Sequence, residues 1–236
     1  MINLLVGEHE CSIPEKWNEI NLKDYTKIFE IINQNKFVEP ADDIQANFTE
    51  SERKTLELER GLHNVRINRK VFAEFTGIDK SIINQVDGDE MANTLSLMAK
   101  FLNGEVEKKA LQKEQNNSFE LKGKKYFYPI AEMKDTSFGD YIEAAQLELL
   151  AEKHKAGRVG IIAEQMAVLC RENGEQYDEK LVAKKTKLFG ALTMDVVWSF
   201  VFFLTKQTNI FKKHIQTYSR TEGETAIDTQ QSISKS

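Results

Sequence analysis

The chain has 236 residues, of which 41% are hydrophobic, and its 14 Phe, 6 Tyr and 2 Trp are enough to build one large core or two smaller ones. Charged residues make up 29% and prolines number only 3, a composition typical of helix-rich globular proteins. The formal net charge of −5 argues against a protein that depends on neutralising nucleic-acid phosphates.

Membrane and disulfide-rich classes are also disfavoured. The N-terminal residues MINLLVGEHE lack the basic region and the long apolar run of a signal peptide. The most apolar stretch, VVWSFVFFL at 196–204, is too short to cross a bilayer. Cys11 and Cys170 lie far apart and form no CxxC pair, so we expect a reducing compartment and no disulfide framework.

The first half of the chain predicts a small hairpin followed by helices. Two short strands surround Gly7 and end at Pro14, because proline cannot donate to a strand ladder. Asn21 and Asp24 form an N-cap pattern that opens a helix, whose apolar face includes Tyr25 and which fades near residues 33–35. Residues 36–48 predict a loop. Helical patterns follow at 49–60, at 65–75 up to the cap Gly77, at about 80–85 and at 91–102.

The second half repeats this order. A hairpin at 118–128 turns at Lys122-Gly123, and Ser137 with Asp140 caps a helix that contains Tyr141 and reaches residue 149. Further helices are expected at 159–171, at 178–189 and from 194 onward.

Residues 2–25 align without a gap on residues 118–141, at a constant offset of 116. The aligned identities are Gly7 with Gly123, Asp24 with Asp140, and Tyr25 with Tyr141. The glycines are expected to turn the hairpins, the aspartates to cap helices, and the tyrosines to anchor those helices to a core. We therefore predict a mainly α fold of two related helical lobes, each opened by a small β-hairpin, that arose by internal duplication.

The predicted domains follow from this alignment. They are an N-terminal repeat at 1–104 with an insertion at about 36–64, a polar linker at 105–117, a C-terminal repeat at 118–218 and a flexible tail at 219–236.

No pattern indicates a catalytic, cofactor or metal site. The four histidines lie on separate elements, and the acidic run at 87–90 places Met98 where a calcium loop needs a glutamate. Phosphate-cradling loops and a G-x-S-x-G elbow are absent. We expect a protein that is not an enzyme and that needs no cofactor.

Two surfaces remain candidates for partner binding. Trp198, Phe202 and Phe203 lie in a helix that is apolar on all sides; the core is the favoured interpretation, and a partner surface stays open. Lys122, Lys124 and Lys125 beside the aromatic residues 126–128 resemble a single-strand nucleic-acid platform. The matching residues 8–12 of the first half are not basic, so nucleic-acid binding is disfavoured.

Several short patterns carry a resemblance to a known family. The first half holds I-P-x-x-W-x-x-I-x-L-x-x-Y, formed by Ile13, Pro14, Trp17, Ile20, Leu22 and Tyr25, and later F-T-G-I at 75–78. The second half holds GKKY, MKDTSFGDY, GEQYDE and LTMDV. Together they resemble morphogenesis proteins of tailed bacteriophages, in particular tail-assembly-chaperone-like proteins, over most of residues 2–204.

The resemblance implies a helical, non-enzymatic protein that binds other virion or tail polypeptides during assembly in the host cytoplasm. The main alternative is a structural or packaged virion component at the portal or tail, and the second is a nucleic-acid-associated protein. A homo-oligomer is left open, and no membrane partner is expected.

Overall fold

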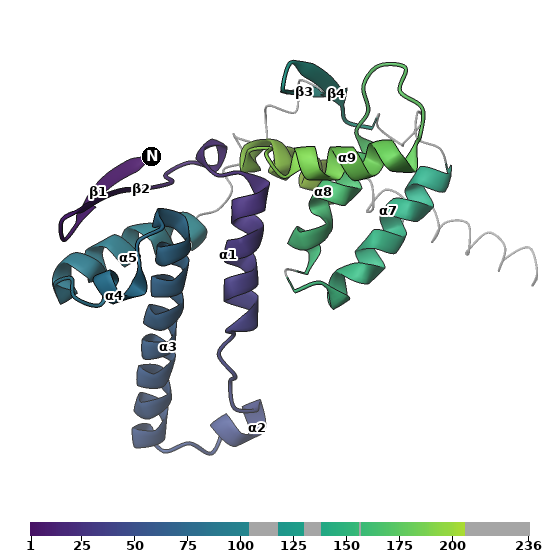
Figure 1. Ribbon diagram of the computed structural model, residues 1–236. Helices are drawn as coiled ribbons and strands as arrows, with labels where there is room; N and C mark the ends of the chain where they lie inside the picture. The colour runs from purple at the N-terminus through teal and green to yellow at the C-terminus, as the bar shows by residue number, and fades with distance from the viewer. Residues whose placement is uncertain (104–117, 130–137, 156, 206–236) are drawn as a thin grey trace, which may run out of the picture.

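The computed structural model describes residues 1–103, 118–129, 138–155 and 157–205 (Figure 1). The expected linker 105–117, the tail 219–236 and the cap residue Ser137 lie outside these residues. The described chain is mainly helical and carries two separate antiparallel hairpins, which confirms the predicted fold class at this level.

The first half begins with a hairpin and continues with helices. Its elements are β1 (Ile2–Val6), β2 (His9–Ile13), a 3₁₀ turn (Trp17–Glu19), α1 (Leu22–Gln34), α2 (Asp42–Gln45), α3 (Glu50–Thr76), α4 (Lys80–Ile83) and α5 (Gly88–Asn103). In Figure 1, α1 and α3 run side by side, and α2 lies at their far end. The hairpin, α4 and α5 contact α3 from its other side.

The second half is built around one buried helix. Its elements are β3 (Ser118–Leu121), β4 (Lys124–Phe127), α7 (Phe138–Leu150), a 3₁₀ turn (Ala151–Lys153), α8 (Arg158–Leu169), α9 (Glu179–Phe189) and a last helix described over 194–205. Helix α8 packs against α7, α9 and α1, and most of its side chains are therefore buried.

Residues 36–76 differ from the prediction. Residues 42–45 of the expected loop form α2, and the two helices expected at 49–60 and 65–75 are one helix of 27 residues. Thr49 and Glu52 form a capping box that starts α3, and Gly77, with a φ of 70°, ends it. Gly61 lowers helix propensity without breaking the helix, because a glycine can adopt helical angles.

The two hairpins use different turns. Gly7 is the first of two turn residues between Val6 and His9, and it alone has a positive φ, as a type II′ turn requires. Lys122 and Gly123 both have positive φ, as a type I′ turn requires. The aligned glycines therefore turn their hairpins from different positions.

A short strap joins the two halves. The backbone N–H of Leu22 donates to the carbonyl of Leu192 at 2.8 Å, and the N–H of Met194 donates to the carbonyl of Ile20 at 2.9 Å. Asn21 and Thr193 thereby form an isolated antiparallel bridge. The buried side chains of both halves form one continuous hydrophobic cluster around this strap.

Candidate functional site

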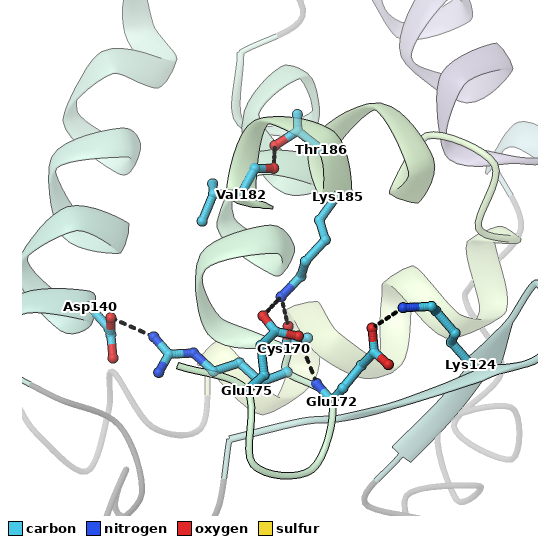
Figure 2. Close-up of polar contacts among 9 residues, drawn as sticks. Lys124, Asp140, Cys170, Glu172, Glu175, Val182, Lys185 and Thr186 are labelled. Atoms are coloured by element: carbon cyan, nitrogen blue, oxygen red, sulfur yellow. Dashed lines mark hydrogen bonds and ion pairs between the residues drawn. The ribbon is translucent and has the colours of Figure 1, made fainter. Parts of the chain in front are cut away.

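A charge network with buried members lies beside the second hairpin (Figure 2). Lys185 of α9 is only 3% exposed. Its Nζ donates to Glu175 Oε1 and to the carbonyl oxygen of Cys170, each at 2.6 Å. The same Nζ lies 5.8 Å from the ring centroids of both Tyr126 and Phe189, so aromatic faces complete its surroundings.

The loop between α8 and α9 extends this network to the hairpin. Glu175 accepts a hydrogen bond from the backbone N–H of Glu172 at 3.0 Å, and Glu172 pairs with Lys124 of β4 at 2.7 Å. The hydrogen bond from Lys124 to Glu172 raises the pKa of the lysine. Backbone hydrogen bonds in both directions between Phe127 and Arg171 hold the same strand against the loop.

A second buried ion pair reaches α7. Asp140 is 2% exposed, and its Oδ1 lies 2.6 Å from the guanidinium of Arg171. The guanidinium also lies 5.8 Å from the ring of Tyr177. A hydrogen bond to Glu143, then burial, raises the pKa of Tyr177 to about 12. The network thus ties β4, α7 and α9 to one loop.

These contacts hold separate elements of the second half together. We call the set formed by Lys124, Asp140, Arg171, Glu172, Glu175 and Lys185 the internal staple. Each buried charge faces an opposite charge at short range, as a buried ion must to offset its desolvation. Burial raises the pKa of the Cys170 thiol far above its usual range, which keeps the thiol protonated and a poor nucleophile. Among the described residues, no group of three or more His, Cys, Asp or Glu side chains could hold a metal ion.

The structure describes the predicted turn and cap residues of the first half fully and those of the second half in part. The side chain of Asn21 accepts from the N–H of Asp24 at 2.9 Å, and its amide donates to the Asp24 carboxylate at 2.7 Å. Tyr25 is buried, and burial raises its pKa to about 12. Asp140 occupies the first turn of α7, as expected, but its carboxylate pairs with Arg171. The side chain of Tyr141 lies outside the description.

The three candidate partner residues separate in the structure. Trp198 is half-buried and packs edge-on against Trp17 and Tyr25 of the first half, with centroid distances of 5.7 and 6.0 Å. Phe202 is 41% exposed, and Phe203 is half-buried. Trp198 therefore belongs to the contact between the halves. Phe202, in contrast, is not covered by any other part of the chain that the structure describes.

Of the three aromatic residues at 126–128, only Phe127 is exposed, at 39%. Tyr126 is buried against Phe119 and Phe189, so its ring is closed to stacking. Lys124 is neutralised by Glu172, and Lys125 lies over the Phe127 ring at 5.5 Å.

Sequence reasoning missed the staple. One local signal could have revealed it: Lys185 stands three residues after Val182 and four before Phe189, on the apolar face of α9. A lysine on such a face is buried only when a carboxylate meets it. Glu175 and Arg171 lie in an irregular loop, where no periodic pattern points to them.

Comparison of the chain with protein-family models, with curated proteins and with solved structures finds no match. Within the described residues, no helix is both long enough and apolar enough to cross a membrane. The function is therefore inferred from the residues and their geometry.

Proposed function

We propose that this protein is a non-enzymatic morphogenesis protein of a tailed bacteriophage that binds other tail or virion polypeptides during assembly, as a tail-assembly chaperone does. The proposal rests on the sequence resemblance together with one structural observation. Helix 194–205 uses its buried side for the core and still presents Phe202 outward at 41% exposure, with Phe203 beside it. Phe202 is exposed and Phe203 is half-buried, and aromatic side chains placed in this way suit an apolar polypeptide segment.

The internal staple supports a scaffold in place of an enzyme. Its charges fix the second hairpin and the loop before α9 relative to α8 (Figure 2). Rigid positioning of the surrounding helices suits a protein whose work is binding. The host cytoplasm during assembly is the proposed site of action.

We also propose that the two halves arose by duplication with one inserted residue. Helices α1 and α7 each span 13 residues and begin 116 positions apart. The hairpins match at an offset of 115, since Val6↔His9 corresponds to Leu121↔Lys124. At that offset Pro14 corresponds to Pro129. The gapless alignment at 116 therefore misplaces the hairpins by one residue.

A binding measurement tests the proposed function. The full chain is co-expressed with each tail polypeptide of its phage, and complex formation is measured by calorimetry on the purified pair. Replacing Phe202 and Phe203 by serine should weaken binding at least about tenfold if both rings enter the interface. Leu149→Ser is the matched control, because Leu149 is 77% exposed on a different helix. Equal affinities for all three chains would sink the proposal.

The alternative of a structural virion component is separated by mass spectrometry of purified particles. A tail-assembly chaperone should be absent or present at trace level, whereas many copies per particle would favour the alternative. The contacts of Tyr126 and Lys124 count against the nucleic-acid alternative, and undetectable DNA binding at low salt would remove it.

A further inference from the structure

Residues 50–66 of α3, which we call the arm, carry an exposed apolar stripe. Leu58, Leu62 and Val65 are spaced i, i+4, i+7 and share one helix face, and they are 65%, 52% and 54% exposed. We call these three side chains the arm stripe. Seven residues after Val65 the same face reaches Phe72, which is fully buried. Arg69 interrupts this face between Val65 and Phe72, so the exposed apolar stripe is confined to the part of the face before Arg69.

The opposite face of the arm contacts the segment that precedes α2. Arg60 donates two hydrogen bonds to the carboxylate of Glu39, at 2.8 and 2.9 Å, and the His63 ring stacks edge-on against Phe37. In Figure 1 the arm extends past α4 and α5 toward α2. The arm is therefore held in place from one side, while the arm stripe faces solvent on the other.

Gly61 lies within this surface and is unexplained by the fold of one chain. It sits in the interior of α3, where glycine is the least favourable residue apart from proline. A Cβ atom built at Gly61 would meet nothing within 4 Å, so no contact of the described chain requires a glycine there. Glycine at such a place permits close approach of another backbone.

The charges beside the arm stripe are self-complementary. Glu59 and Arg66 lie on one side of it, both exposed, and are separated by seven residues, or about 10.5 Å along the helix. Within the described part of the chain, neither makes an ion pair. In an antiparallel pair of identical helices that cross near Gly61 and Leu62, Glu59 of each copy comes beside Arg66 of the other.

The geometry points to self-association: two copies of this chain pack their α3 arms as a crossed antiparallel pair. The pair is centred near residues 62–63, with the arm stripes between the copies, Gly61 close to the crossing point and two Glu59–Arg66 contacts along one flank. The interface is isologous, since the same patch meets itself across a two-fold axis. The helices cross at an angle because the body of each copy covers the face from Phe72 onward. A crossing of about 50° is the commonest packing of helix ridges into grooves.

A charge exchange between copies tests the proposed contact. Glu59→Arg and Arg66→Glu each place like charges opposite each other in a homodimer. Sedimentation equilibrium at about 100 µM, where weak interfaces are populated, should therefore show that each variant dimerises at least tenfold more weakly than the wild type. When the two variants are mixed, a heterodimer again has opposite charges at both side contacts, so mixing should restore the dimer. A wild-type chain that stays monomeric at this concentration would overturn the proposal.

Substitutions at Leu62 and Gly61 test the same dimer independently of the charged residues. Leu62→Glu and Gly61→Ala should both reduce dimerisation, and far-UV circular dichroism should be unchanged because both positions are exposed. Leu149→Glu on α7 is the control and should dimerise as the wild type does. A dimer that survives Leu62→Glu would place the interface elsewhere. A monomer whose binding to a tail polypeptide is lost on Leu62→Glu would assign the arm stripe to that polypeptide and also overturn self-association.

Discussion

At the scale of single residues, Lys185 is the side chain whose loss should cost most. Its ammonium group is buried with one carboxylate, so Lys185→Met leaves Glu175 charged and without its partner. We expect a loss of about 3–5 kcal/mol in the free energy of unfolding, measured by urea denaturation. The double variant Lys185→Met with Glu175→Leu should recover most of that loss, because both buried charges are then gone. A single variant as stable as the wild type would contradict the buried pair.

The two cysteines should differ in reactivity although both are free. Cys170 is fully buried, and Cys11 is half-buried on β2. Burial raises the pKa of both thiols, and far more at Cys170. A thiol reagent at pH 8 should therefore modify Cys11 slowly in the folded protein and Cys170 only after unfolding. Mass spectrometry of labelled peptides measures this, and Cys11→Ser should show no labelling before unfolding.

At the scale of elements, replacing glycine by alanine should have opposite effects on stability at two positions, one inside α3 and one at its end. Gly61→Ala should stabilise the folded chain by up to about 1 kcal/mol, because alanine favours the helix and meets no atom. Gly77→Ala should destabilise it by about 1–2 kcal/mol, since Gly77 ends the helix with a φ of 70°. Thermal unfolding of both variants at about 1 µM protein, well below the concentration at which a weak dimer forms, measures the stability of the single chain. Two variants that are both stabilised, or both destabilised, would refute this account.

Elements set by local chemistry were predictable from the sequence. The cap at Asn21, the stop at Gly77 and the turn at Lys122-Gly123 depend on residues within one turn of each other, and the structure has all three. Contacts between distant segments were not predictable. Asp140 illustrates the limit: its place in the first turn of α7 follows from the pattern, but its partner Arg171 belongs to a loop that the pattern does not connect to it.

At the scale of the whole molecule, the halves share one core. Trp17 and Trp198 come from opposite halves, and their ring centroids lie 5.7 Å apart. We therefore expect one cooperative unfolding transition. Trp17→Phe and Trp198→Phe each leave a single tryptophan, and in each variant the fluorescence midpoint in urea should equal the circular-dichroism midpoint. Two separated midpoints would favour independently folding lobes, the division predicted from the duplication.

The strap between Asn21 and Thr193 has a consequence for synthesis on the ribosome. The N-terminal hairpin and α1 leave the ribosome early, but the residues that complete their core follow roughly 170 positions later, which is about 10–35 s of translation at ordinary rates. During that interval Trp17 and Tyr25 lack Trp198, their neighbour from the last helix. We therefore expect the nascent first half to expose these aromatic side chains until the last helix emerges, and slow decoding between these points should lengthen that exposure.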